Sequence, residues 1–514
     1  MLLLDTLQKK KGKRWVFLYV VLSINLLIFL ELIYTLKPYW NEINSEVSGW
    51  VGFEFDIVLL IRTILVIPFY YGLVLIIINI RRFIKTDEIT PRSLNKVLPL
   101  ILIILYNVIF SVLLYILDQY GQVKRILEVL DFYSIFLIYL SEILLIVLLY
   151  PIIKIVSKIK NYFSEKFLDP NKKAAIIVVS LMVLYIFAFI IPLIYRPSNV
   201  ISGNLPPKPD LIVHRGASSL APENTIEAGI AALDYNNVVG WEVDIRISFD
   251  GVPFLMHDET LQRTTDISNH FPGRENDRAE TFSISELKEL DAGSWFVEKD
   301  PFETISKGIV SDTKAESYKG IKIPTFEEVL NFTRDNNYYL DFDAYGPDPS
   351  HPYYDDFYEI LLNMTIASGI DLSKIMIPTA NTEWIDMINT RAPNILLGLE
   401  GSPSTVEFES SLYNYSYINT EDTYSNIGYR ALHQSDIPVM VYVIDTKERH
   451  SQLWCFGVNW VKTNTPYKFN NITEPLWYMN QWNYQIISII FIIAAISSAI
   501  IIKSGLLNKL ISRK

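Results

Sequence analysis

The chain contains six long apolar segments, five of them before residue 200 and one after residue 480. These segments are Trp15–Leu36, Ile57–Ile80, Leu98–Leu117, Phe132–Ile153, Ala174–Tyr195 and Tyr484–Ile502. Each has close to the ~20 residues that an α-helix needs to cross the hydrocarbon core of a bilayer. Buried helices of a globular core are the alternative, but such helices are seldom apolar on every side. The sequence therefore predicts a multi-pass integral membrane protein with an α-helical bundle.

Lysine and arginine residues gather on one side of these segments. They lie before the first segment and after the second, the fourth and the sixth, and include Lys9, Lys13, Arg14, Arg81, Arg82, Lys154, Lys158, Lys509 and Arg513. The connection after the first segment is instead acidic, with Glu42, Glu46 and Glu54. Because basic connections stay on the cytoplasmic side, both termini are expected to be cytoplasmic. The region between the fifth and sixth segments is then expected to be extracellular or lumenal.

This intervening region has the composition of a soluble domain. The net charge of the chain is −11, and most of the acidic residues lie in this region. We expect no nucleic-acid partner, because binding to a phosphate backbone needs a basic surface. The single cysteine, Cys455, excludes an intrachain disulfide. The glycosylation triplets that begin at Asn331, Asn363, Asn414 and Asn471 agree with a non-cytoplasmic location.

Short apolar runs typical of strands alternate with amphipathic helical patterns in this region. The predicted strands are Leu211–His214, Trp241–Ile247, Tyr339–Asp343, Ile375–Pro378, Ile395–Leu399, Tyr415–Asn419, Val439–Ile444 and Trp460–Asn464. Eight strands with intervening helices over roughly 270 residues fit a TIM (β/α)8 barrel. A doubly wound open sheet is the alternative, and the number of strands favours closure.

These patterns predict the organisation of the whole chain. Residues 1–196 form a five-helix transmembrane region, and residues 197–209 form a proline-rich linker. Residues 210–475 form the barrel, residues 483–503 the sixth transmembrane helix, and residues 504–514 a cytoplasmic tail.

A hairpin is expected at the end of the second strand. Asp250-Gly251 is a turn signal that follows this strand directly. Folding the chain about Asp250 brings His257 back beside the strand. His257 is therefore expected to lie close to Glu242 and Asp244.

Active groups of such barrels lie at the C-terminal ends of the strands. The residues at these predicted ends are His214, Arg215, Glu242, Asp244, Asp341, Asp343 and Lys462. Carboxylates two residues apart on a strand point the same way, so Glu242 and Asp244 can bind one hard cation. A site made of oxygen ligands suits Ca²⁺ or Mg²⁺ better than zinc. The guanidinium of Arg215 fits phosphate oxygens. His214 and His257 can then act as general base and general acid. Each residue taken alone is as readily a surface or core side chain, but their joint placement favours a site.

The order and spacing of five motifs resemble the signature of glycerophosphodiester phosphodiesterases. The motifs are His214-Arg215-Gly216, Pro222-Glu223-Asn224-Thr225, Glu242-Val243-Asp244, Asp250-Gly251-Val252-Pro253 and His257-Asp258. The chain is similar to the six-transmembrane ectoenzyme branch of this family. The stretches Leu261–Thr265 and Ala292–Phe296 also resemble that branch. The resemblance implies a TIM barrel between the fifth and sixth spans, one divalent cation, and two catalytic histidines.

The resemblance also implies roles for single residues. Carried over by position, His214 and His257 are the acid–base pair, and Arg215 is catalytic and binds substrate. Glu223 forms or supports the phosphate site. The implied substrates are glycerophosphodiesters or phospholipid-derived diesters. Phospholipase-like cleavage of glycolipid anchors or lysophospholipids is an alternative activity.

The implied metal ligands are Glu242, Asp244 and a carboxylate from a later strand. Asp343 is the predicted third ligand, and Asp341, on the same face, is the alternative. The family places a basic residue two positions after the third ligand, whereas this chain has Tyr345 there. The departure removes a positive charge from the phosphate site. It is the one observation that favours a catalytically impaired barrel acting as a receptor or regulator.

Overall fold

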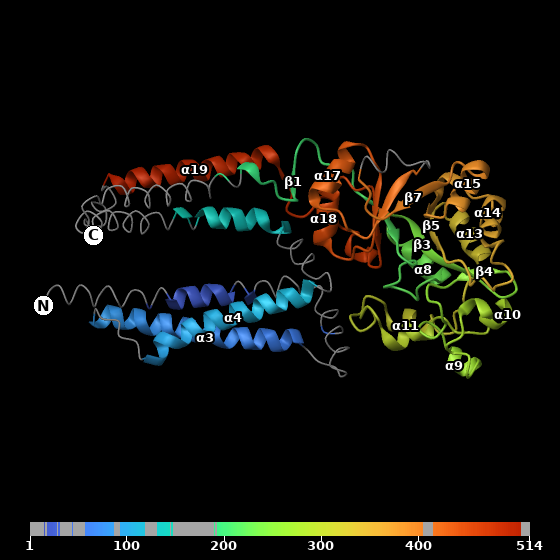
Figure 1. Cartoon of the computed structure of the whole chain (residues 1–514), viewed down its shortest axis with the longest axis horizontal. Helices are drawn as coiled ribbons and strands as arrows, with labels where there is room; N and C mark the ends of the chain where they lie inside the picture. Colours follow the sequence, from blue (N-terminus) through green and yellow to red (C-terminus); the bar gives the residue numbers. More distant parts are fainter. Residues whose placement is uncertain are drawn as a thin grey trace. The chain divides into compact units, whose positions relative to one another are not determined.

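A computed structural model describes residues 57–86, 93–118, 131–143, 193–404 and 415–504, together with residues 15, 18–27, 29, 30, 44, 145, 146 and 190. The chain divides into two compact units, Met1–Leu137 and Ile138–Lys514 (Figure 1). Each unit is described here by itself.

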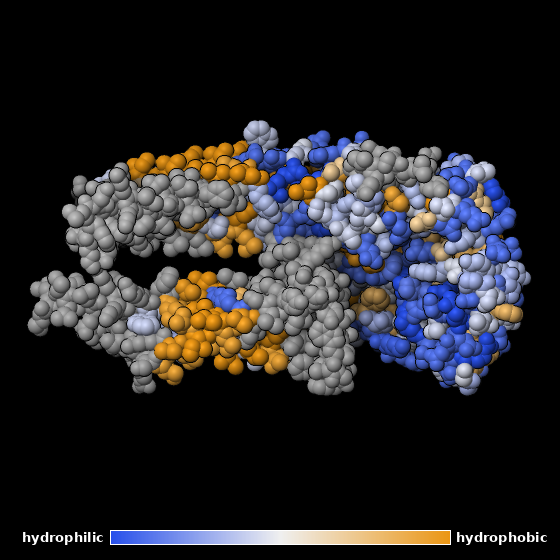
Figure 2. All heavy atoms as spheres, in the orientation of Figure 1, coloured by the Kyte–Doolittle hydropathy of each residue, from blue (hydrophilic) through white to orange (hydrophobic). Residues whose placement is uncertain are grey.

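The first unit is helical. It contains α3 (Ile57–Thr86), α4 (Ser93–Asp118) and the shorter apolar helix Leu18–Leu27. These helices pack along a narrow apolar seam that includes Leu22, Leu26, Val58, Leu65 and Tyr106. Many other apolar side chains of α3 and α4 are exposed, and Figure 2 shows them as an apolar surface. Lipid, unlike water, covers such a surface without a free-energy cost.

Two helices in the described part of the chain are long and apolar enough to cross a membrane. They are Val58–Asn79 within α3 and Gln481–Ile502 within α19 (Gln481–Lys503). Of the other predicted spans, Leu98–Leu117 falls within α4. The predicted spans Trp15–Leu36 and Phe132–Ile153 are described only in part. Ala174–Tyr195 is described only at residues 190 and 193–195, and most of the basic connections lie outside the described residues.

The second unit contains a closed barrel of eight parallel strands. The strands are β2 (Asp210–Val213), β3 (Val238–Ile247), β5 (Tyr339–Ala344), β6 (Ile375–Pro378), β7 (Leu396–Glu400), β8 (Tyr417–Thr420), β9 (Val439–Val441) and β10 (Trp460–Thr463). Strand β2 pairs with both β3 and β10, which closes the ring. The closed ring confirms the predicted TIM barrel and excludes the open-sheet alternative. Each predicted strand overlaps an observed one, with ends that differ by up to three residues.

Helices cover the outside of the barrel. They are α8 (Ile226–Ala232), α13 (Phe326–Asp335), α14 (Phe357–Ala367), η3 (Leu372–Lys374), α15 (Thr382–Arg391), α17 (Asn426–Gln434), α18 (Lys447–Phe456) and η4 (Pro466–Lys468). Hydroxyl or amide side chains cap most of the longer ones, as Thr225 does for α8 and Ser425 for α17. The core between helices and strands is apolar, and Trp241 lies in it with its Nε1 donating to Thr333 Oγ1 at 2.9 Å.

An insertion follows the second strand. The hairpin strand β4 (Pro253–Leu255) runs antiparallel to β3. The short helices α9 (Ile267–His270), η2 (Ala279–Thr281), α10 (Ile284–Leu287), α11 (Ser294–Lys299) and α12 (Asp312–Glu316) come next. This insertion has a small apolar core of its own, including Phe254, Phe282 and Leu290. Phe271 and Ala279 pack in this core, whereas Val310, Ala315 and Tyr318 belong to the core of the barrel.

The linker and the last helix meet on one side of the barrel. Strand β1 (Val200–Ile201) pairs with β11 (Met479–Asn480), which leads directly into α19. Arg430 of α17 donates to the carbonyl oxygens of Pro197 and Ser198 at 2.8 and 3.0 Å. The two ends of the barrel domain are therefore fastened to each other and to α17.

Replacing Trp241 with alanine is expected to lower the free energy of unfolding of the barrel by about 3–5 kcal/mol. The ring is fully buried, and its loss leaves a cavity and removes the hydrogen bond to Thr333 Oγ1. Chemical denaturation followed by circular dichroism measures the change. Ile427→Ala, at a position that is 78% exposed on α17, is the control and should shift the value by less than about 0.5 kcal/mol. Equal stability of W241A and wild type would contradict this view of the core.

Candidate active site

The loop after β2 carries the first site residues. Arg215 and Gly216 both have positive φ angles, 53° and 75°. A Cβ atom on Gly216 would lie 2.5 Å from the Cβ of Ala228, so the turn needs glycine there. The backbone N–H of Arg215 donates to Glu242 Oε2 at 2.7 Å. The motif His214-Arg215-Gly216 is thus a tight turn that holds His214 and Arg215 against the end of β3.

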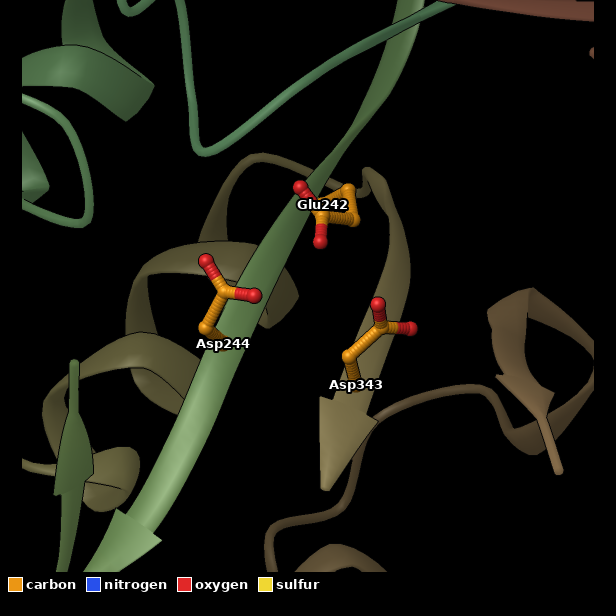
Figure 3. A group of neighbouring side chains, drawn as sticks. All are labelled: Glu242, Asp244 and Asp343. Carbon is orange, nitrogen blue, oxygen red and sulfur yellow. The ribbon is translucent and has the colours of Figure 1, made fainter. Parts of the chain in front are cut away.

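Carboxylates from β3 and β5 meet at the mouth of the barrel. The strands pair in parallel with Glu242 opposite Asp341 and Asp244 opposite Asp343. Glu242, Asp244 and Asp343 each offer an oxygen atom within 4.8 Å of the others, and Figure 3 shows these three side chains converging on one point. Such a set of hard oxygen donors has the chemistry of a Ca²⁺ or Mg²⁺ site.

The electrostatics of this cluster favour a bound cation. Burial, and then the neighbouring carboxylate of Asp244, raise the pKa of Glu242. Burial and Asp343 likewise raise the pKa of Asp244, against the influence of Arg215. In their ionised forms, Glu242, Asp244, Asp341 and Asp343 carry four negative charges, whereas Arg215 and Lys462 supply two positive charges among them. A divalent cation supplies the balance, so the residues present fit such an ion.

Lys462 of β10 enters the cluster from the opposite wall of the barrel. Its Nζ lies 2.5 Å from Asp341 Oδ2, and both side chains are almost fully buried. Coulombic attraction to Asp341, Asp343 and Glu242 keeps the amine protonated. Asp341 is thus ion-paired, while Asp343 faces Glu242 and Asp244. This geometry supports Asp343 as the third ligand in preference to Asp341.

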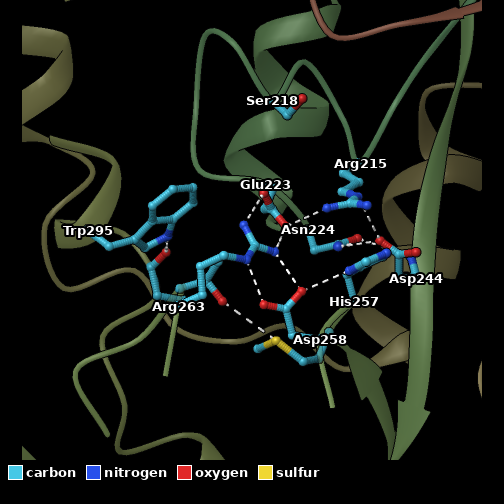
Figure 4. Close-up of polar contacts among 12 residues, drawn as sticks. Arg215, Ser218, Glu223, Asn224, Asp244, His257, Asp258, Arg263 and Trp295 are labelled. Atoms are coloured by element: carbon cyan, nitrogen blue, oxygen red, sulfur yellow. Dashed lines mark hydrogen bonds and ion pairs between the residues drawn. The ribbon is translucent and has the colours of Figure 1, made fainter. Parts of the chain in front are cut away.

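Arg215 is held between two carboxylates. Its Nη1 lies 3.1 Å from Glu223 Oε1, and its Nε lies 3.3 Å from Asp244 Oδ2. Asn224, which also has a positive φ angle, donates from Nδ2 to Asp244 Oδ2 at 2.7 Å and accepts from the Asp244 N–H at 3.0 Å (Figure 4). The predicted residues Arg215 and Glu223 therefore lie together beside the candidate metal ligands.

Arg263 is the main site residue that the sequence does not single out. It makes two hydrogen bonds to Glu223, at 2.9 and 2.7 Å, and its Nε donates to Asp258 Oδ2 at 2.6 Å (Figure 4). The guanidinium of Arg263 thereby joins Glu223 to Asp258, the residue that contacts His257. The stretch Leu261–Thr265, which resembles the family, contains Arg263 and was the available signal.

The hairpin brings His257 to the cluster as predicted. Ile245 pairs with Leu255, and the Met256 N–H donates to the Asp244 carbonyl at 3.0 Å. His257 Nδ1 lies 2.8 Å from Asp258 Oδ1. Burial raises the pKa of Asp258, but hydrogen bonds from Arg263 and His257 outweigh this effect and lower the pKa to about 2. Asp258 is therefore an anion in direct contact with the ring of His257.

His214 has a different environment. Its Nδ1 lies 2.8 Å from the amide oxygen Oδ1 of Asn464, and its Nε2 lies 3.9 Å from Glu242 Oε2. Burial, and then the positive charge of Arg215, lower the pKa of His214 to about 4. His214 is therefore a neutral imidazole at neutral pH.

Comparison with known proteins identifies the domain. Residues 214–468 match the glycerophosphoryl diester phosphodiesterase family. This domain belongs to that family. The glycerophosphoinositol inositolphosphodiesterase GDPD2 of Mus musculus is 34% identical over 59% of this chain and 55% of its own length. The glycerophosphodiester phosphodiesterase domain-containing protein 5 of Gallus gallus is 31% identical over 61% of this chain and 51% of its own. The chain spans about half the length of these curated relatives.

Two further proteins are similar to this part of the chain. A glycerophosphodiester phosphodiesterase of Bacillus subtilis is 26% identical over 53% of this chain and 89% of its own length. Among solved structures, a phosphodiesterase from Oleispira antarctica is 20% identical, covering 51% of this chain and 94% of its own, with a TM-score of 0.40.

Asp343→Asn is expected to weaken Mg²⁺ binding by on the order of 10²-fold, since loss of a supporting group alone costs 10–100-fold. Asp341→Asn should instead leave Lys462 as a buried unpaired charge and cost roughly 3–5 kcal/mol of stability. Calorimetric titration with Mg²⁺ and chemical denaturation measure the two effects. If D341N abolished binding and D343N did not, the third ligand would be Asp341.

Proposed function

We propose that this chain is a membrane-anchored, metal-dependent glycerophosphodiester phosphodiesterase. The observation that carries the proposal is the convergence of three carboxylates, two of them buried, with one arginine and two differently paired histidines at the mouth of the barrel. The family of the domain supports the same reaction. The proposed substrates are glycerophosphodiesters or diesters derived from phospholipids.

Each group has a part in cleaving the diester. Glu242, Asp244 and Asp343 would hold a divalent cation, which would supply a Lewis acid and positive charge for the phosphoryl oxygens. Arg215, held by Glu223 and Asp244, adds a second positive charge directed at phosphate. Lys462 supplies the positive charge that Tyr345 does not, from a different strand and at a buried position.

The two histidines divide the proton transfers. His214, neutral and with Nδ1 on Asn464, takes a proton at Nε2 from water or from a neighbouring substrate hydroxyl as that oxygen bonds to phosphorus. The bond from phosphorus to the leaving alcohol oxygen breaks. His257, supported by the anionic Asp258, donates a proton to that oxygen. The products are a phosphomonoester, or a cyclic phosphate, and a free alcohol.

Membrane anchoring at both ends of the barrel is part of the proposal. Supporting it are the two helices able to cross a membrane and the joint attachment of the linker and α19 through β1 and β11. The distribution of basic residues supports a multi-pass chain with cytoplasmic termini and an extracellular or lumenal barrel.

His257→Ala is expected to lower turnover of glycerophosphocholine or glycerophosphoinositol by about 10²–10⁴-fold, because the leaving oxygen then departs without a proton. Removal of divalent cations with EDTA should abolish turnover, and added Mg²⁺ or Ca²⁺ should restore it. Release of the free alcohol by the purified chain is the measurement. His270→Ala, a half-exposed histidine paired with Asp266, is the matched control and should retain full activity. Absence of EDTA-sensitive turnover with any diester would favour the receptor interpretation.

The exposed Asn363 and Asn471 test the orientation. In a glycosylating host, both are expected to carry glycans, so that deglycosylation increases the mobility of the chain on a gel. Asn363→Gln and Asn471→Gln should each remove one step of this shift. A sequon reporter added after Lys514 should stay unmodified. Glycosylation of that reporter, with none on the barrel, would reverse the proposed topology.

A further inference from the structure

A chain of hydrogen bonds extends from His214 away from the metal site. Asn464, which follows β10, joins His214 to Asp445, which follows β9. His214 Nδ1 lies 2.8 Å from Asn464 Oδ1, and Asn464 Nδ2 donates to Asp445 Oδ2 at 2.8 Å. Ser218 Oγ also donates to Asn464 Oδ1 at 2.8 Å. These contacts join residues that are up to 250 positions apart in the sequence.

The hydrogen bonds of Oδ1 set the orientation of the Asp445 carboxylate. Oδ1 accepts from the backbone N–H of Asn464 at 2.8 Å, from Thr463 Oγ1 at 2.9 Å and from Thr465 Oγ1 at 3.2 Å. Oδ2 is left to face the side-chain amide of Asn464. Because a carboxylate only accepts hydrogen bonds, it requires the NH₂ group of Asn464 on its side and the amide oxygen on the other.

The orientation of Asn464 decides which nitrogen of His214 carries the proton. An amide oxygen that faces Nδ1 requires an N–H there. In the neutral imidazole, Nε2 then has the free lone pair, and Nε2 is the nitrogen on the side of Glu242. A general base needs this form, since the opposite tautomer has no lone pair to offer the nucleophile.

We propose that Asp445 and Asn464 form a tautomer lock that holds His214 with its proton on Nδ1 and so makes it the general base. Both are positioning residues that act through His214. The catalytic consequence rests on the proposed function, whereas the tautomer itself depends only on the hydrogen bonds described above.

Asp445→Asn is the sharpest single test, because it changes one oxygen to an NH₂ group. The three donors on Oδ1 keep the oxygen of the new amide in place, so its NH₂ group faces the NH₂ group of Asn464. Two donors cannot pair, and Asn464 is expected to turn its amide over and direct NH₂ at His214. The proton of His214 then moves to Nε2, and kcat/KM should fall on the order of 10³–10⁴-fold, as when a triad histidine takes the wrong tautomer.

The exchange variant D445N/N464D is the matched control. It places an NH₂ group on residue 445 and a carboxylate on residue 464, so every hydrogen bond of the wild-type chain has a donor and an acceptor again. It should return the proton to Nδ1 and raise kcat/KM above that of either single variant. Because the new carboxylate beside His214 also stabilises the protonated ring, the recovery is expected to increase as the pH rises. N464D alone puts two carboxylates at hydrogen-bond distance, where one must take up a proton, and should lose activity.

Solid-state NMR of the full chain in lipid bilayers reads the tautomer directly. The chain has six histidines, so ¹⁵N-histidine labelling gives few signals, and His214→Gln assigns the signals of His214. We expect a protonated Nδ1 and an unprotonated Nε2 in the wild type and the exchange variant, and the reverse in D445N.

Three results would overturn the lock: a wild-type His214 protonated on Nε2, an unchanged tautomer in D445N, or an exchange variant no more active than either single variant. The first needs no variant, so a folding defect in D445N does not remove the test. If the tautomers are as expected but the wild type turns over no diester, the proposed function is contradicted and the tautomer lock still stands.

Discussion

Burial of like charges at the mouth of a closed barrel constrains the whole domain. The parallel pairing of β3 with β5 sets Glu242 beside Asp341 and Asp244 beside Asp343, with little access for water. Carboxylates that are brought together in such a place raise one another's pKa values and oppose folding in their ionised form. The side chains around them therefore have to supply positive charge or hydrogen-bond donors.

The compensation comes from three directions. Lys462 reaches Asp341 across the barrel, and Arg215 reaches Asp244 from the loop after β2. Arg263 stays outside this cluster and pairs with Glu223 and Asp258, so the residues that position Arg215 and His257 are themselves neutralised. Tyr345 stands where the family has a basic residue, and Lys462 on β10 places a positive charge among these carboxylates from a different strand.

Local patterns were enough to predict the barrel and the residues of its mouth. Alternating apolar runs mark each strand, and the acidic pair on β3 and the turn at Asp250 place His257 correctly. The contacts that were not predicted join distant segments: Lys462 with Asp341, Arg263 with Glu223, and His214 with Asn464. No short-range period encodes them, because they depend on which strands become neighbours when the ring closes.

The two histidines show why these long-range partners matter. Each uses Nδ1 to contact a neighbour, but the neighbour of His257 is a carboxylate and that of His214 is an amide. The carboxylate of Asp258 carries a negative charge, whereas the amide oxygen of Asn464 beside the buried ring of His214 does little to offset the cost of burying charge there. In the proposed mechanism, the two histidines therefore differ in the charge of their neighbours before any substrate binds. Under the proposed function, the two histidines take opposite roles because the residues that contact their Nδ1 atoms differ in a single functional group. These residues are Asp258, after β4, and Asn464, after β10.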